Sequence, residues 1–143
     1  MNIIKNGRIN KGLTPQNWKE VRIISKPTVI FDFDGVIHSY TSGWQGVTSI
    51  PDPPVPGIKE AIQQIREDYR VIVVSTRCFQ PGGIEAIQNY LAKHGIEVDG
   101  VAAEKVPAIL TVDDRAICFD GRPERLLEKI KSFKPWNKLH FEV

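Results

Sequence analysis

Two acidic residues stand two positions apart at the end of an apolar segment, a spacing that suits shared chemistry. Residues 28–33 are predicted to form a strand that carries Asp32 at its end, and Asp34 and Gly35 follow. A continuous apolar run is typical of a strand buried on both faces, as in a parallel sheet. Two carboxylates so close together repel each other unless a positive charge lies between them. An Asp-rich turn without function is the alternative interpretation.

Other unusual polar clusters also follow predicted strands. One strand ends at residues 75–77, and another ends at residues 113–114. In a doubly wound sheet, ligands bind outside the carboxyl ends of the strands, where the strand order reverses. The coincidence predicts one composite site. Its candidate residues are Asp32, Asp34, Gly35, Ser75, Thr76, Arg77, Asp113 and Asp114, with Lys105 from a connecting loop.

Such a site would hold more negative than positive charge, which favours a divalent cation. The candidate ligands are all oxygens, without an accompanying His/Cys set, and hard oxygen ligands favour Mg²⁺ over zinc. Magnesium typically takes a substrate phosphate as a further ligand. The predicted metal ligands are Asp32, Asp34, Asp113 and Asp114.

The remaining groups suit phosphate chemistry. Hydroxyls at Ser75 and Thr76 and the amine of Lys105 are suitable donors to phosphate oxygens. A carboxylate beside a bound phosphoryl group can act as a covalent nucleophile and form an aspartyl-phosphate. A second carboxylate can protonate the leaving oxygen and then deprotonate the attacking water.

The four segments together resemble the motifs of the haloacid dehalogenase (HAD) superfamily of phosphohydrolases. Asp32-Phe33-Asp34-Gly35-Val36 resembles the first motif, Ser75 the second, Lys105 the third and Asp113-Asp114 the fourth. The resemblance spans roughly residues 28–120. It is to the small capless members, whose open sites accept large substrates or are closed by a partner subunit, so a homo-oligomer is one expectation.

The resemblance implies a role for each matching residue. Asp32 would be the nucleophile and a metal ligand, and Asp34 the general acid/base, with its backbone carbonyl on the metal. Ser75 would hydrogen-bond the phosphoryl group, and Lys105 would offset negative charge. Asp114 would bind magnesium directly or through water, with Asp113 in support. Gly35, Thr76 and Arg77 are the substrate-binding candidates, although Arg77 could instead pair with the neighbouring acids.

Strands alternate with helices along the chain, which predicts an α/β fold: a doubly wound three-layer sandwich with a mostly parallel sheet and no cap domain. The last helix is predicted to turn Leu126, Leu127, Ile130 and Phe133 inward. The predicted strands are residues 28–33, 70–77, 98–102, 108–112 and 116–119, and the predicted helices are residues 58–69, 84–94 and 123–133.

The domain organisation follows from the same pattern. A hairpin signal at Asn6-Gly7 lies in an N-terminal extension, and residues 36–57, too long for a simple connection, are predicted to form a lid loop over the acids. The three predicted parts are residues 1–27 (extension), 28–134 (HAD-like catalytic domain) and 135–143 (tail packing on the domain, with an edge strand at 139–143).

Bulk composition excludes few functions. The 143 residues carry a net charge of +2, too small to indicate nucleic acid or membrane binding by itself. An apolar stretch long enough to span a bilayer and a signal peptide are both lacking, which predicts a cytoplasmic protein. Cys78 and Cys118 have no metal-type spacing and fit free thiols, although two cysteines could pair.

The leading functional prediction is a Mg²⁺-dependent phosphatase that hydrolyses a phosphomonoester, such as a nucleotide or a sugar phosphate, through an aspartyl-phosphate. One alternative is a phosphatase for nucleic-acid ends or phosphoprotein. The other is a non-catalytic phosphate- or metal-binding module. A phospho-accepting receiver domain has a similar acid cluster, but its paired acids and acceptor aspartate come in a different order along the chain.

Overall fold

A four-stranded, all-parallel sheet forms the centre of the protein. The computed structural model describes residues 4–5, 8–9 and 26–137. The strand order is β5-β4-β3-β6, so the chain first builds outward on one side of β3 and then returns to its other side. The strands are β3 (Thr28–Phe31), β4 (Arg70–Val74), β5 (Gly100–Ala102) and β6 (Leu110–Val112).

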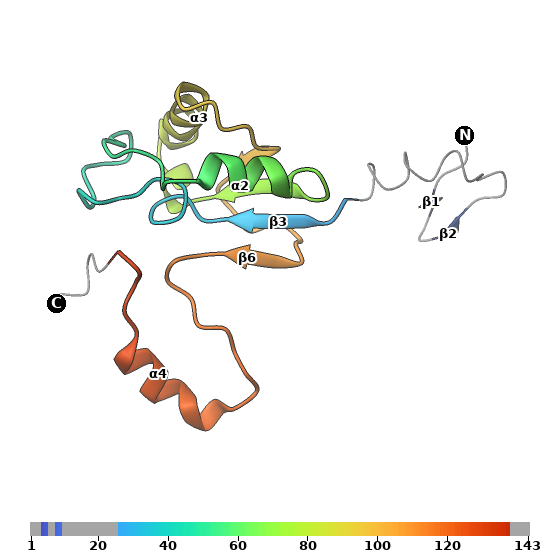
Figure 1. Cartoon of the computed structure of the whole chain (residues 1–143), viewed down its shortest axis with the longest axis vertical. Helices are drawn as coiled ribbons and strands as arrows, with labels where there is room; N and C mark the ends of the chain where they lie inside the picture. Colours follow the sequence, from blue (N-terminus) through green and yellow to red (C-terminus); the bar gives the residue numbers. More distant parts are fainter. Residues whose placement is uncertain (1–3, 6–7, 10–25, 138–143) are drawn as a thin grey trace.

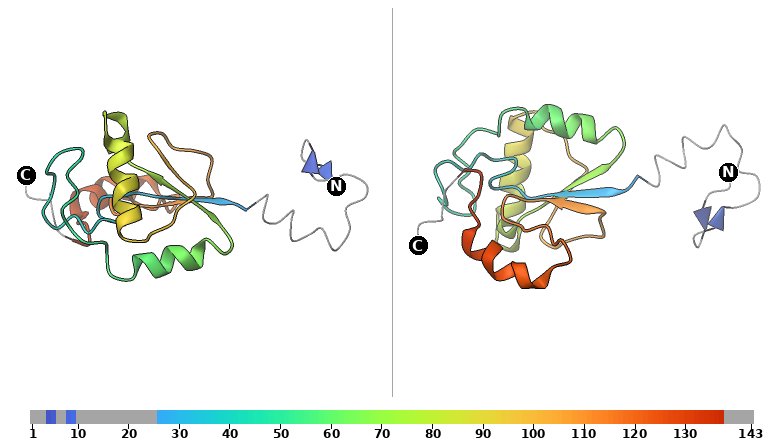
Figure 2. Two further views of the ribbon diagram at one scale, coloured as in Figure 1. Left: turned by 90° about the horizontal axis from the view of Figure 1, so that it is seen from above. Right: turned by 60° about the horizontal axis from the view of Figure 1, so that its bottom comes forward.

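Helices flank this sheet, which confirms the predicted α/β fold with a parallel sheet. Figure 1 shows α2 and α3 on one side of the sheet and α4 on the other, and Figure 2 gives two further views of these elements. The helices are α2 (Ile58–Ile65), α3 (Gly83–Lys93) and α4 (Leu126–Ser132), with short 3-10 helices at η2 (Thr76–Phe79) and η3 (Pro123–Arg125).

The core lies between the sheet and the two helices α2 and α3. Alternate side chains of β3 and β4, such as Phe31 and Val73, point to the same face because side chains alternate along a strand. They pack against Ile62 of α2 and against Ile87 and Leu91 of α3. Each fully buried side chain of this kind contributes about 1.5–3 kcal/mol. This packing fixes the position of the β3 carboxyl end.

The register of the strands brings the predicted site residues together at the carboxyl ends of the strands. Phe31 of β3 pairs with Val73 of β4 on one side and with Val112 of β6 on the other. Asp32, the next residue, donates its backbone N–H to the Val112 carbonyl at 2.9 Å. The strand order reverses between β3 and β6, so the site lies at the switch point at which doubly wound sheets bind ligands.

The predicted fifth strand at residues 116–119 is wrong. The chain turns after β6, where the Arg115 N–H donates to the Asp113 carboxylate at 2.8 Å. Ala116 then lines two pockets and does not pair with the free edge of β6. A strand needs a neighbouring strand to pair with, and this turn directs residues 116–119 away from the unpaired edge of β6.

The prediction that the last helix buries its apolar face is also wrong in part. Leu127 and Ile130 of α4 are 63% and 59% exposed, and Leu126 and Phe133 are only half-buried. Phe119, before the helix, and Leu110, on β6, are similarly exposed. Helical periodicity correctly indicated a helix but not what covers its apolar face.

The two ends of the chain are described only in part. The hairpin signal at Asn6-Gly7 is confirmed, because β1 (Ile4–Lys5) and β2 (Arg8–Ile9) pair in antiparallel fashion. The rest of the N-terminal extension up to residue 25, and the edge strand predicted at 139–143, lie outside the described residues. Cys78 and Cys118 are free thiols. Within the described chain, no helix is both long and apolar enough to cross a membrane.

Candidate functional site

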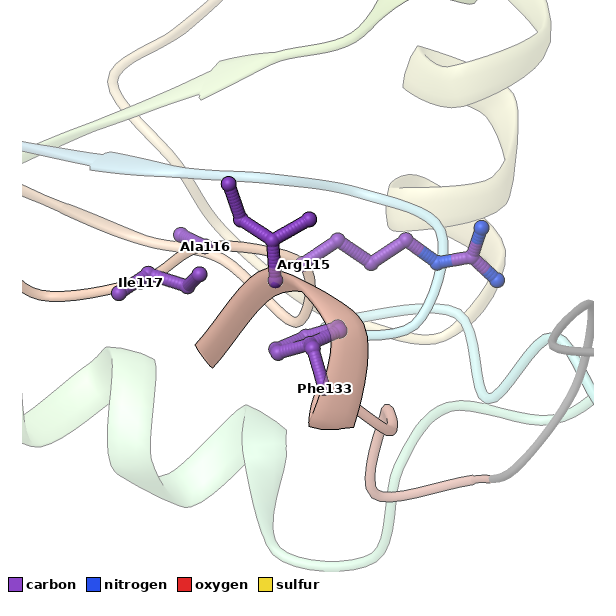
Figure 3. A pocket seen from close by; sticks show the side chains of 5 residues that line it. Arg115, Ala116, Ile117 and Phe133 are labelled. Carbon is purple, nitrogen blue, oxygen red and sulfur yellow. The ribbon is translucent and has the colours of Figure 1, made fainter. Parts of the chain in front are cut away.

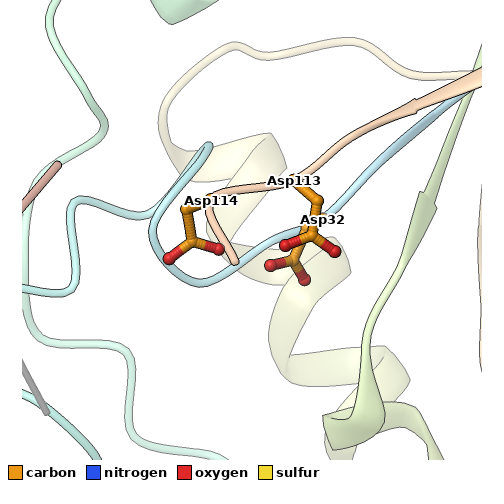
Figure 4. A group of neighbouring side chains, drawn as sticks. All are labelled: Asp32, Asp113 and Asp114. Carbon is orange, nitrogen blue, oxygen red and sulfur yellow. The ribbon is translucent and has the colours of Figure 1, made fainter. Parts of the chain in front are cut away.

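Three carboxylates converge at the carboxyl ends of β3 and β6, where Figure 4 shows them as neighbours. One oxygen each from Asp32, Asp113 and Asp114 lies within 4.8 Å of the others. We call these three residues the carboxylate cluster. The sequence predicted all three as metal ligands, and the parallel pairing of β3 with β6 brings them together.

The cluster carries more negative charge than its surroundings balance. Burial, a side-chain hydrogen bond with Asp114 and the charge of Asp113 together raise the pKa of Asp32 to about 8. Burial and the charge of Asp113 also raise the pKa of Asp114, against the hydrogen bond from Asp32 and other lowering contacts. At neutral pH the cluster therefore retains a proton unless a cation takes its place.

These residues fit a magnesium ion. The cluster offers converging carboxylate oxygens, the ligands that this hard cation prefers. Gly35 makes room for them, since a Cβ atom at this position would overlap the Asp114 carboxylate. Gly35 also has a φ angle of +86°, a conformation that favours glycine. The Asp34 carboxylate is not part of this cluster, and the sequence analysis expected Asp34 to bind the metal through its backbone carbonyl.

Lys105 and Asp32 line the same pocket. Its volume is about 290 Å³, and Asp113 also contributes to its wall. The pocket thus has an amine and two carboxylates in its lining, although Lys105 comes from an exposed loop. The other lining residues are Ile30, Val74, Thr111 and Ala116.

Asp34 lies in a different environment from Asp32. The Arg77 guanidinium donates to both of its carboxylate oxygens, at 2.7 Å from Nε and 3.0 Å from Nη2. His38 Nδ1 lies 2.8 Å from the same carboxylate. Burial pushes the pKa of Asp34 upward, but the hydrogen bonds from His38 and Arg77 and the charge of Arg77 outweigh it and hold the pKa below its ordinary value. Asp34 is therefore ionised at neutral pH.

Arg77 also holds the lid loop, residues 36–57. Its Nη1 donates to the backbone carbonyls of Gly46 and Val47, both at 2.8 Å, and of Ser49 at 3.2 Å. The Arg77 side chain is buried, and its guanidinium lies 4.6 Å from the centre of the Trp44 ring. The sequence analysis left open whether Arg77 contacts substrate or neighbouring acids, and this geometry gives it Asp34 and the loop as partners.

Sequence reasoning missed the part that His38 takes in this arrangement. The His38 ring is fully buried, and its Nε2 accepts the backbone N–H of Asp52 at 3.1 Å. Because Nε2 accepts, the proton of the neutral ring lies on Nδ1 and is donated to Asp34. His38 and Asp52 lie in a segment without helical or strand periodicity, so the sequence pattern did not indicate this contact. We call Asp34, His38, Asp52 and Arg77 the Arg77 network.

The two hydroxyl candidates follow β4. Ser75 is buried, and its Oγ accepts the Arg77 backbone N–H at 3.2 Å, which caps η2. A hydroxyl that accepts this bond keeps its own O–H as a donor. Thr76 is exposed in the first turn of η2. Both residues lie at the same sheet edge as Asp32, because β4 pairs with β3 in parallel.

The described part of the C-terminal segment also reaches the site. Trp136 Nε1 donates to the Gly35 carbonyl at 2.7 Å, a contact that nothing in the sequence indicated. Between α4 and the segment that follows β6, a pocket of about 330 Å³ is lined by Arg115 and by apolar side chains. Figure 3 shows the Arg115 side chain extending away from the apolar ones. Its Nε lies 3.8 Å from Asp114.

Comparisons with known proteins give no family assignment. No protein-family model and no curated protein matches the chain. A chain in a structure of the Pnkp1/Rnl/Hen1 RNA repair complex is 23% identical, with a TM-score of 0.43 over 74% of this protein. A chain in a second structure of the Pnkp1/Rnl/Hen1 complex is 21% identical, with a TM-score of 0.45 over 79%. This protein covers 31% and 37% of those two chains.

Proposed function

We propose that the protein is a Mg²⁺-dependent phosphatase of the HAD type, which hydrolyses a phosphomonoester through an aspartyl-phosphate on Asp32. The observation that carries the proposal is that Asp32 takes part in two arrangements at once. It belongs to the carboxylate cluster and also lines a pocket with Lys105. A nucleophile for phosphoryl transfer needs this combination of a site for a cation on one side and a positive side chain on the other.

Each residue of the site has a separate role in this reaction. When bound by Asp32, Asp113 and Asp114, the metal would neutralise charge and polarise a phosphoryl oxygen. A carboxylate oxygen of Asp32 attacks phosphorus, and the bond from phosphorus to the leaving oxygen breaks. Lys105 offsets the negative charge of the phosphoryl group, and the Ser75 O–H donates to one of its oxygens. Water then cleaves the aspartyl-phosphate and regenerates Asp32.

Asp34 is expected to act as both general acid and general base, and its surroundings suit the general base better. An ionised carboxylate can accept a proton from the attacking water. It cannot donate one to the leaving group while it remains paired with Arg77 and His38. Substrates whose leaving oxygen needs little protonation, such as aryl phosphates, should therefore react faster than alkyl phosphates.

The test is phosphate release from a panel of aryl, sugar and nucleotide phosphates and phosphorylated oligonucleotides, with Mg²⁺ and with chelator. Turnover should require Mg²⁺ and fall at least about 1,000-fold in Asp32→Asn, because the nucleophile is lost. Asp68→Asn changes an exposed acid outside the cluster and should keep full activity. Circular dichroism checks that both variants are folded.

A non-catalytic module would give a different result. The wild-type protein would bind Mg²⁺, and Asp32→Asn would weaken that binding, without phosphate release from any substrate. That combination would refute the enzymatic proposal and would leave the carboxylate cluster as a binding site only.

A further inference from the structure

Two half-exposed tryptophans lie beside the candidate active site. Trp44 belongs to the lid loop and is 51% exposed, and Trp136 belongs to the C-terminal segment and is 57% exposed. Figure 1 shows these two segments at the same end of the sheet, beyond the carboxyl end of β3. Both tryptophans leave much of their surface open next to the proposed phosphate site.

The Trp44 and Trp136 rings both make contacts that lead to Asp34-Gly35. The Trp44 ring lies against the Arg77 guanidinium, which is itself bonded to Asp34. The Trp136 indole N–H is bonded to the carbonyl of Gly35. An aromatic side chain that is already fixed loses little conformational entropy when a ligand stacks on it.

We propose that Trp44 and Trp136 form a stacking surface for a nucleobase, so that the substrate is a nucleotide, either free or at the end of a strand. This inference rests on the proposed phosphatase function. Every base has a flat aromatic face, and stacking on an aromatic side chain is sequence-tolerant and favourable. A sugar phosphate has no such ring and would leave both indoles exposed to water.

The first experiment compares two substrates that differ only in the base: adenosine 5′-monophosphate and ribose 5-phosphate. We expect the wild-type kcat/KM to be at least about tenfold higher for the nucleotide, from the stacking of one base. Trp44→Leu and Trp136→Leu should each reduce this ratio about fivefold or more, because leucine keeps bulk but has no aromatic face. Phe119→Leu is the control, since Phe119 is 57% exposed but lies outside the two segments. It should keep the ratio.

A second variant separates stacking from loop support. Trp136→Phe keeps an aromatic ring but removes the N–H that bonds Gly35. The nucleotide preference should be largely retained in this variant. A loss as large as in Trp136→Leu would show that the hydrogen bond, and not the ring, sets the preference, and would overturn the assignment for Trp136.

Binding provides a readout that does not depend on turnover. In the Asp32→Asn variant with Mg²⁺, adenosine monophosphate should quench tryptophan fluorescence and ribose 5-phosphate should not, and either Trp→Leu change should reduce the quenching. Hydrolysis of both substrates at equal kcat/KM without quenching would refute the stacking surface while the phosphatase stands. Quenching without hydrolysis would refute the phosphatase while the stacking surface stands. Phosphorylated trinucleotides, tested beside the mononucleotide, distinguish strand ends from free nucleotides.

Discussion

The carboxylate cluster and the Arg77 network begin from acids only two residues apart, yet their electrostatics are opposite. Asp32 faces other acids, and its pKa is raised to about 8. Asp34 is enclosed by an arginine and a histidine, and its pKa is lowered. The network supplies its own cation in Arg77, whereas for the cluster we propose a bound Mg²⁺. Under the proposed function, the acid without a balancing charge is the nucleophile, whereas the acid that is paired with Arg77 belongs to the network that holds the lid loop.

The largest expected effect comes from removing the cation of the Arg77 network. Arg77→Met should lower the free energy of unfolding by about 3–5 kcal/mol, because Asp34 loses its buried partner and three loop carbonyls lose a donor. Urea unfolding measures this. Arg66→Met, which breaks a more exposed pairing with Asp99 and Glu97, should cost about 1 kcal/mol or less. Equal losses in the two variants would contradict the structural role given to the network.

A smaller effect is expected at the buried histidine. His38→Leu removes the donor to Asp34 and leaves the Asp52 N–H without its acceptor, which should cost about 1–3 kcal/mol. His94→Leu changes a half-buried histidine outside the network and should cost about 0.5 kcal/mol. Thermal unfolding of the two variants side by side tests the difference. A stable His38→Leu protein would mean that the network does not need its imidazole.

The cluster can be disturbed without substituting a residue of the network. In Gly35→Ala the new methyl group would overlap the Asp114 carboxylate, and we expect Mg²⁺ affinity to fall about tenfold. Gly121→Ala is the matched control: its φ angle of +82° imposes a similar backbone strain, but a Cβ there meets no atom within 4 Å. Isothermal titration with Mg²⁺ should separate the two variants. Equal Mg²⁺ affinities would rule out the proposed collision.

The response of stability to pH should also distinguish the two acids, because their contributions have opposite signs. Asp32 ionises near pH 3.8 when unfolded and near 8 when folded, so between these values the folded protein holds an extra proton. Without divalent cation, the free energy of unfolding should therefore fall with rising pH, by at most about 1.4 kcal/mol per pH unit. Asp34 has a lowered pKa, so its contribution is present above its ordinary pKa of 3.8 and is lost as the pH falls through the folded value.

Urea unfolding between pH 5 and pH 8 in chelator measures the Asp32 effect. Asp32→Asn, or saturating Mg²⁺, should flatten the dependence. The same fall in Asp32→Asn would assign it to another group and would weaken the contrast between the two acids.

The sequence predicted the parts of the site that depend on strand ends. Asp32, Asp113 and Asp114 follow apolar strands, and parallel pairing then brings strand ends together. The same local signals predicted the central helices, whose apolar spacing matches the face that they bury.

The rest depended on contacts that local pattern does not encode. The bonds from Arg77 to Asp34 and to the lid loop join residues 28 to 43 positions apart, and Trp136 reaches Gly35 across 101 positions. Tertiary contacts also decide whether an apolar stretch pairs as a strand. They decide in the same way whether the apolar face of a helix is buried. For that reason the prediction failed for the strand at residues 116–119 and for the burial of the apolar face of α4.

The bonding of the lid loop has a consequence for the time course of substrate exchange. The loop lies outside the helices and strands of the fold, yet the amides of Ser39, Asp52 and Val55 are all hydrogen-bonded within the loop, and the Tyr90 hydroxyl fastens it to α3. Such amides exchange with deuterated solvent only when their bonds open. Their exchange should therefore be slow for a loop, closer to that of the core strands. The loop would then act as a fixed wall, and substrate would enter and leave past it without waiting for it to open.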